Sequence, residues 1–182
     1  MAEHSWWRPA PQTDQLTGRA LARPYVSRFF SSWWPAVLWG GLIFFLSTDT
    51  FSAQHTGSIL YPVLHWFFPS LTLKQFAPIH HLIRKSAHFT EYFIFCLLLF
   101  RGARGDRQGW RWTWALAALS VAAGYSALDE IHQAFVASRT ASPWDSLLDS
   151  VGAFAASLVL FVWHRRRSAR PPAAADDDFT PR

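Results

Sequence analysis

The chain has a single cysteine, Cys96, so no disulfide can form within it. Charged residues are also scarce: 16% of the 182 residues are Asp, Glu, Lys or Arg, whereas 51% are hydrophobic. The net charge is +5, but the arginines flank apolar blocks and form no single basic face, so nucleic acid is not an expected partner. Apolar residues gathered into blocks at this level predict a membrane protein, with the lipid bilayer as its surroundings.

Four apolar blocks each come close to the roughly 17–25 residues that a helix needs to cross a bilayer. They cover residues 29–48, 82–100, 110–128 and 147–163. We therefore predict an all-α membrane protein with a bundle of four transmembrane helices over residues 29–167. Pro35 fits near the start of the first helix, where its missing N–H costs little. Residues 1–28 and 168–182 are polar or rich in Pro and Ala, and we expect both to be disordered cytoplasmic tails.

Between the first two blocks lies a shorter apolar segment, residues 59–69, interrupted by Pro62 and Pro69. It is too short to span a bilayer. We expect an interfacial or re-entrant segment that covers part of the protein's outer face.

Basic residues predict the orientation of the chain in the membrane. Clusters of arginine precede the first block, separate the second from the third, and follow the fourth. The connection after the third block carries Arg139 as its one basic residue, against several acidic ones. By the positive-inside rule both termini and the middle loop are cytoplasmic.

Charged and polar residues occupy the outer ends of the last three predicted helices, where apolar side chains are expected. Each Asp, Lys or Arg at mid-bilayer costs roughly 2.5–3.5 kcal/mol on insertion-based scales. Such residues must therefore lie near an interface, pair with one another, or line a wet cavity. Helical spacing gathers them into stripes that meet at one depth, and Gly152 would let two helices approach closely. The residues are Lys85, His88, Glu91 and Tyr92, then Asp129, Glu130, His132 and Gln133, then Asp145 and Asp149.

The same stretches resemble the VanZ-like family of small bacterial membrane proteins. The resemblance rests on R-K-x-x-H-F-x-E-Y from Arg84, on D-E-x-H-Q-x-F from Asp129, and on the following Arg139, Asp145 and Gly152. The chain departs from the family pattern in two places: Ala137-Ser138 replaces a Pro-Gly, and Asp149 replaces a common Asn. The resemblance implies an envelope protein, associated through the family's name-giving member with resistance to the glycopeptide teicoplanin.

These observations favour an outer-face site that binds a polar or anionic envelope ligand, with Arg139 added to the ten residues above. Three alternatives stay open. A His beside carboxylates suits a membrane-embedded, metal-assisted hydrolase or transferase acting on lipid-linked or cell-wall precursors, although no G-x-S-x-G motif is present. A small transporter is disfavoured, because the inner half of the third block has Ser120 as its only polar side chain. The residues could also form a purely structural ion-pair network.

A divalent metal is a further option. His88, His132 and Asp129 are the candidate ligands, since imidazole and carboxylate suit Zn²⁺ and related ions. The chain has no compact H-E-x-x-H signature, so the ligands would have to come from separate helices.

Overall fold

The computed structural model describes residues 25–48, 51–136 and 142–169. Within these ranges the chain forms five helices and no strand, which confirms the all-α prediction. The helices are α1 (Tyr25–Leu46), α2 (Ala53–Phe67), α3 (Leu73–Arg104), α4 (Trp112–Ala134) and α5 (Pro143–Ser168).

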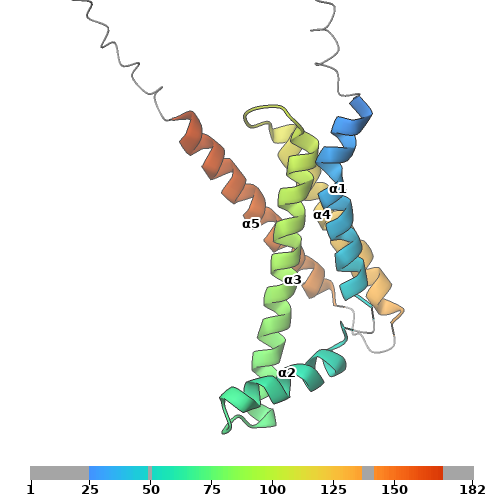
Figure 1. Ribbon diagram of the computed structural model, residues 1–182, viewed down its shortest axis with the longest axis vertical. Helices are drawn as coiled ribbons and strands as arrows, with labels where there is room; N and C mark the ends of the chain where they lie inside the picture. Colours follow the sequence, from blue (N-terminus) through green and yellow to red (C-terminus); the bar gives the residue numbers. More distant parts are fainter. Residues whose placement is uncertain (1–24, 49–50, 137–141, 170–182) are drawn as a thin grey trace, which may run out of the picture.

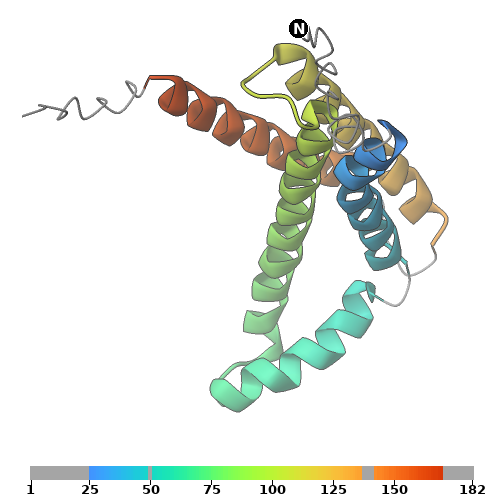
Figure 2. The same cartoon turned by 45° about the horizontal axis from the view of Figure 1, so that its top comes forward.

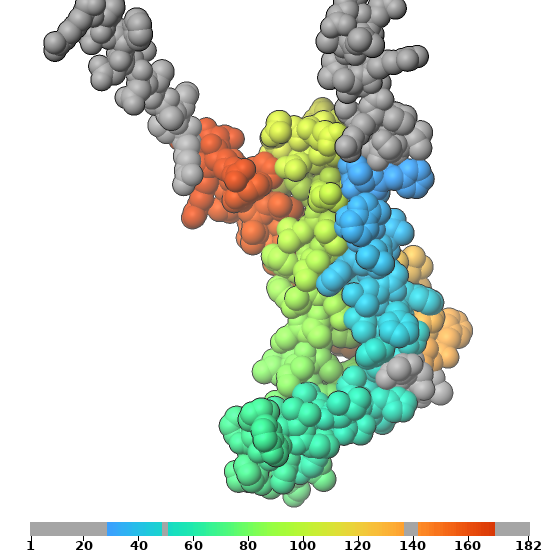
Figure 3. All heavy atoms as spheres, in the orientation of Figure 1, coloured from blue at the N-terminus to red at the C-terminus, as the bar shows by residue number. Residues whose placement is uncertain are grey.

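Helix α3 is the centre of the molecule. Helices α1, α4 and α5 all pack against it, and α4 and α5 also contact each other (Figure 1). Helix α2 lies across one end, running from the end of α1 towards the start of α3 (Figure 2). The space-filling view shows α2 and the first turns of α3 projecting beyond the other helices (Figure 3). The end of α1, the end of α4 and the start of α5 all face this α2 end.

Local sequence signals explain where the helices begin and end. Thr72 and Gln75 form a reciprocal capping box at the start of α3, and the Ser52 side chain accepts from the His55 N–H at the start of α2. Pro143 opens α5 at a position where a missing N–H costs nothing. Gly105, with a positive φ of 57°, ends α3.

The core combines bulky side chains from α3 with small ones from its neighbours. Tyr92, Phe95 and Phe100 of α3 are buried against alanines of α4 and α5. The closest approach is at Gly152, where an added Cβ would lie 2.4 Å from the Phe89 carbonyl oxygen. The prediction that Gly152 permits close helix packing is therefore confirmed.

Two helices are long and apolar enough to cross a membrane by length and composition, over Phe29–Leu46 and Pro143–Ser168. Helix α3 carries charges such as Arg84, Lys85 and Glu91 within its length, and neither α3 nor α4 meets the same criterion. The structure thus supports a helical membrane protein, and the four-span arrangement stays a prediction.

Helices α1 and α3 extend beyond the apolar blocks predicted as membrane spans. Helix α3 starts at Leu73, well before residue 82, because the capping box at Thr72 lets polar residues begin the helix. Helix α1 starts at Tyr25, inside the predicted tail, so Pro35 lies in its middle and not near its start. Residues 1–24 and 170–182, the rest of the predicted tails, lie outside the described residues.

The apolar segment at 59–69 falls largely within α2, which stays helical through Pro62. No residue of α2 is buried. Ile59, Val63 and Trp66 follow helical spacing and are all exposed, Trp66 by 77%. An exposed apolar face on a helix lying across the bundle is typical of an interfacial helix.

Candidate functional site

Asp129, near the end of α4, is one centre of the polar network at the α2 end. Its Oδ2 accepts hydrogen bonds from Ser47 Oγ, just after the end of α1 (2.7 Å), and from Gln133 Nε2 (3.0 Å). Gln133 Nε2 also donates to Ser47 Oγ at 3.3 Å. All three side chains are buried, so this triad ties the end of α1 to the end of α4.

Asp149 is the second centre, and its residue is fully buried between α3, α4 and α5. Its Oδ2 accepts from Ser126 Oγ of α4 at 3.1 Å. Its Oδ1 lies 3.6 Å from His88 Nδ1 of α3, within ion-pair range. Close packing at Gly152, one turn further along α5, brings α3 near enough for this contact.

The other predicted site residues of α3 and α5 also meet. Lys85 Nζ lies 3.4 Å from Asp145 Oδ1, with both side chains about one-third exposed. Two of the three predicted stripes, those of α3 and α5, thus meet in direct contacts, Lys85 with Asp145 and His88 with Asp149.

Three predicted site residues, Glu130, His132 and Tyr92, take no part in these two contacts. Glu130 Oε2 accepts a hydrogen bond from the Ser142 N–H at 2.8 Å and so holds the start of α5. The Glu130 side chain is buried and does not face water. The ring of His132 stacks on Phe44 of α1 with centroids 4.7 Å apart. Tyr92 is fully buried in the core beside Phe95, not at an interface. Arg139 lies outside the described residues.

A polar cavity of about 200 Å³ lies between the end of α1, the start of α2 and the middle of α3. The polar side chains lining it are Ser47, Thr56, Arg84, His88 and Glu91. Arg84 Nη1 donates to the Phe51 carbonyl oxygen (3.1 Å) and to Thr56 Oγ1 (3.4 Å). The guanidinium therefore anchors the start of α2 to α3 while it lines the cavity.

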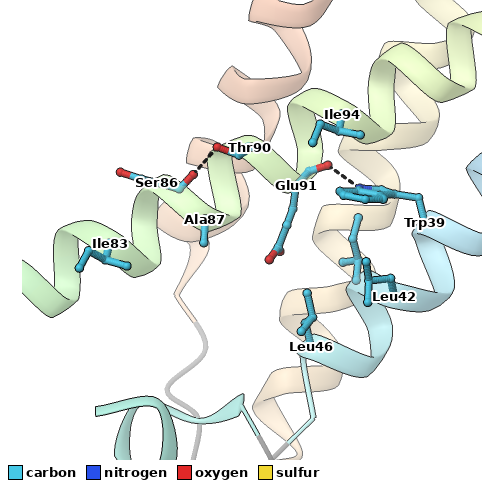
Figure 4. A pocket seen from close by; sticks show the side chains of 10 residues that line it. Trp39, Leu42, Leu46, Ile83, Ser86, Ala87, Thr90, Glu91 and Ile94 are labelled. Carbon is cyan, nitrogen blue, oxygen red and sulfur yellow. Dashed lines mark hydrogen bonds between the residues drawn. The ribbon is translucent and has the colours of Figure 1, made fainter. Parts of the chain in front are cut away.

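Beside this cavity a second, larger groove of about 460 Å³ runs between α1 and α3. Its lining is mostly apolar and includes Trp39, Leu42 and Ile83. Figure 4 shows the Glu91 side chain directed into the space between α3 and the leucines of α1. Trp39 Nε1 donates to the Glu91 carbonyl oxygen at 2.9 Å, which fixes the two helices at this level.

In a comparison with protein families, the VanZ/LLP1 family model matches residues 32–164. This range contains all the helical residues that form the network and the cavity. The chain belongs to the VanZ/LLP1 family. Searches of curated proteins and of solved structures gave no match.

In this VanZ/LLP1 protein the residues of the motifs that resemble the family fall into two groups, one lining the cavity and one behind it. Arg84, His88 and Glu91 of α3 line the cavity, whereas Asp129 and Asp149 lie behind it and hold its walls. The described residues contain no group of three or more His, Cys, Asp and Glu side chains placed to hold a metal ion. The His132 ring stacks on Phe44, so His132 does not share a site with His88.

Sequence reasoning did not assign the serines and Thr56 to the site. Ser47 and Ser126 donate to the two buried aspartates, and Thr56 receives the Arg84 bond. Ser126 lies three residues before Asp129, on the polar stripe of α4, which is a signal that helical spacing offered. Ser47 follows the end of α1 and Thr56 lies in α2, and nothing in the sequence paired them with α3 or α4. Arg84 appeared in the motif but was not counted as a site residue.

Proposed function

We propose that this VanZ-like integral membrane protein binds a polar or anionic envelope ligand in the cavity lined by Arg84, His88 and Glu91. Through that ligand it alters glycopeptide (teicoplanin) susceptibility or cell-wall chemistry. The observation that carries the proposal is the cavity itself, where a guanidinium, an imidazole and a carboxylate converge with the Ser47 and Thr56 hydroxyls. Arginine suits this use because its planar donors match carboxylate and phosphate oxygens.

A four-span placement in the bacterial inner membrane, with both termini cytoplasmic, accompanies this proposal. The outer surfaces of α1 and α5 expose large apolar side chains, among them Phe45 and Phe154. The start of α1, the α3–α4 connection and the end of α5 lie at the end of the molecule opposite α2 (Figure 1). The arginine clusters belong to these three places, which under the positive-inside rule makes that end cytoplasmic.

The energetic cost of the network favours a functional site over a purely structural clamp. Apolar side chains of similar size would join the helices without removing charges from water. Within the described residues, the buried atoms Tyr92 OH, Asp129 Oδ1 and Glu130 Oε1 have no hydrogen-bond partner. Polar groups left incompletely paired lower stability, so their presence is better explained by a requirement of function.

The test compares cavity variants with a surface control in cells that depend on this protein for a teicoplanin phenotype. Arg84→Gln, His88→Gln and Glu91→Gln should each abolish the phenotype while the purified protein remains folded and monodisperse. Lys74→Gln, an exposed position on α3, is the control and should retain the phenotype. Loss of the phenotype only in variants that also lose folded protein would overturn the proposal in favour of a structural network.

One observation favours turnover as a second candidate. His88 lines the cavity with its Nδ1 3.6 Å from the buried Asp149 Oδ1, and a neutral imidazole at this place would use Nε2 as a base. A hydrolase or transferase acting on lipid-linked envelope precursors would use this pair. In proteoliposomes supplied with such a precursor, His88→Gln should then remove product formation but retain precursor binding. If the wild-type protein forms no product, the enzyme proposal is wrong and the ligand-binding proposal remains.

A further inference from the structure

A charged pocket lies at the arginine-rich end of the molecule, opposite α2 (Figure 1). It has a volume of about 390 Å³ and is bounded by the start of α1, the end of α3 and the α3–α4 connection that follows. This volume falls within the roughly 300–1,000 Å³ that ligand sites occupy. None of the residues assigned to the proposed function lines the pocket, so a ligand here would occupy a separate site.

Two arginines, Arg104 and Arg107, line this pocket with one carboxylate, that of Asp106, which gives the lining a net charge of +1. Arg104 is partly buried, and its Nε is buried without a hydrogen-bond partner. Within the part of the chain that the structure describes, neither arginine side chain forms a hydrogen bond or an ion pair. A guanidinium has five N–H donors in a planar fork that matches phosphate oxygens, so these two groups favour an anion of that kind.

The neighbouring Arg101 has a different role. It donates from Nη1 and Nη2 to two backbone carbonyl oxygens at the start of α1, at 3.1 and 3.4 Å, and so holds α1 against α3. The Arg107 guanidinium lies over the Trp114 ring, 5.9 Å from its centroid. Stacking on an aromatic face leaves the N–H donors at the edge of a guanidinium available. Arg104 and Arg107 are therefore the cations of this pocket that have donors left for a ligand.

The wall of the pocket on the α1 side is aromatic. Phe29 and Trp33 form it, with ring centroids 5.9 Å apart, and Phe29 is 52% exposed. Trp33 packs on Gly102 of α3, where an added Cβ would lie 2.8 Å from the indole ring. Phe29 also begins the stretch of α1 that is apolar and long enough to cross a membrane. Aromatic rings at such a place lie at the level of the lipid head groups.

The order of these groups along the helices fits a membrane lipid. Trp33 and Gly102 lie towards the middles of α1 and α3, Phe29 and Arg104 lie nearer the ends of these helices, and Arg107 lies beyond the end of α3. A path outwards from the bilayer thus meets aromatic rings first and guanidinium groups afterwards. A phospholipid has its acyl chains and its phosphate in the same order. A water-soluble phosphate would need the arginines alone.

We propose that this pocket binds an anionic phospholipid of the phosphatidylglycerol type. Its phosphate contacts Arg104 and Arg107, and one acyl chain lies along Phe29 and Trp33. Basic pockets between membrane helices on the cytoplasmic side are places where anionic head groups bind. The lipid holds the arginine-rich end at the membrane surface, and its binding is independent of the ligand proposed for the cavity at the α2 end.

Arg167 of α5 supplies a matched control. Its guanidinium lies over the Trp163 ring, 4.0 Å from the centroid, so it is an arginine stacked on a tryptophan, as Arg107 is. Arg167 is exposed and is not among the residues that line the pocket. Arg167→Gln therefore removes the same charge while the pocket stays intact.

The experiment titrates the full-length protein in an uncharged detergent with phosphatidylglycerol, or with phosphatidylcholine of the same acyl chains, and counts bound lipid by native mass spectrometry. Wild type should prefer phosphatidylglycerol. Arg104→Gln and Arg107→Gln should each weaken phosphatidylglycerol binding about fivefold, the ratio that corresponds to roughly 1 kcal/mol per basic residue. Arg167→Gln should stay within about twofold of wild type. Ser32→Phe, which fills the pocket without a change of charge, should also weaken binding about fivefold.

Three results would overturn the proposal. Equal losses in Arg107→Gln and Arg167→Gln would show attraction by net charge without a site, and equal binding of the two lipids by wild type would show no anion preference. Displacement of the lipid by glycerol 3-phosphate at equal concentration would assign the pocket to a water-soluble phosphate. Variants are compared at matched melting midpoints; Arg107→Gln and Ala103→Leu stand in if Arg104→Gln or Ser32→Phe fails to fold.

Discussion

Single residues decide how closely the helices of this protein approach. Gly152 of α5 is the clearest case, because a Cβ there would lie 2.4 Å from a backbone oxygen of α3, which cannot move aside as a flexible side chain can. Small residues at such crossings allow close packing between membrane helices. The contact between His88 and the buried Asp149 depends on the same approach.

Gly152→Ala should therefore destabilise the protein by about 2 kcal/mol or more, since overpacking against backbone forces the helices apart. Gly124→Ala in α4 is the control, because a Cβ there meets nothing within 4 Å. Both changes raise helix propensity alike, so the difference between their thermal unfolding midpoints in detergent isolates the clash. Equal midpoints would show that the α3–α5 crossing is not as close as described.

The two ion pairs between α3 and α5 should differ in strength. Asp149 is fully buried, whereas Lys85 and Asp145 are about one-third exposed. A double-mutant cycle of His88→Ala and Asp149→Ala should give a coupling energy of about 1–3 kcal/mol. The Lys85→Ala and Asp145→Ala cycle should give less than about 1 kcal/mol, because water screens that pair. Additive effects at His88 and Asp149 would contradict the observed contact.

At the scale of elements, α2 is the helix least attached to the rest. It has no buried residue, and it contacts α3 through a few residues that include the Tyr61–Phe76 ring pair and a polar cluster around Thr56. His80 of α3 stacks on Phe76 with ring centroids 5.2 Å apart, and its Nε2 lies 3.1 Å from Thr56 Oγ1 of α2. His80 lies just outside the predicted span of α3, in the part that only α2 covers.

Protonation of His80 should loosen α2. Burial lowers the pKa of His80 below its ordinary value of 6.5, and the charges of Arg84 and His81 lower it further. The folded protein therefore favours neutral His80, so its contribution to stability is complete above about pH 6.5 and decreases as the pH falls below that value. His80→Gln should flatten the dependence of the unfolding midpoint on pH between roughly 6.5 and 5, and His81→Gln, which removes only the smallest of the three causes, should flatten it much less. A wild-type midpoint that is constant over this range would contradict the prediction.

At the scale of the whole molecule, the polar network and α2 lie at one end and the arginine-rich segments at the other (Figure 1). A membrane separates two aqueous compartments, so the difference between the two ends of the molecule predicts which end faces which compartment. The proposed orientation puts α2 and the cavity outside and the α3–α4 connection in the cytoplasm.

Cysteine labelling tests that orientation in intact cells. Ser58→Cys places a thiol on exposed α2, and Gln108→Cys places one in the exposed α3–α4 connection. A membrane-impermeant maleimide should label Ser58→Cys from outside and Gln108→Cys only after the cells are opened. Wild type is the control and should stay unlabelled, because its one thiol, Cys96, is buried. The reverse pattern would invert the topology.

The sequence by itself determined the helical class, the approximate positions of four of the five helices, the family and which polar residues are exceptional. Apolar periodicity and length are local properties, so they can be read without the fold. The role of Gly152 and the convergence of Lys85 and His88 with Asp145 and Asp149 also followed from spacing and chain direction.

Only the tertiary structure decided which polar residues share a space. Ser47 and Thr56 lie in segments whose sequences do not indicate a partner, yet they meet Asp129 and Arg84, which are dozens of residues away along the chain. His132 is three residues from Asp129 but turns to Phe44, because 300° of helical rotation over three residues directs its side chain to a different neighbour. The groove beside Glu91 likewise depends on how α1 and α3 separate, a property of helix packing that no local pattern encodes.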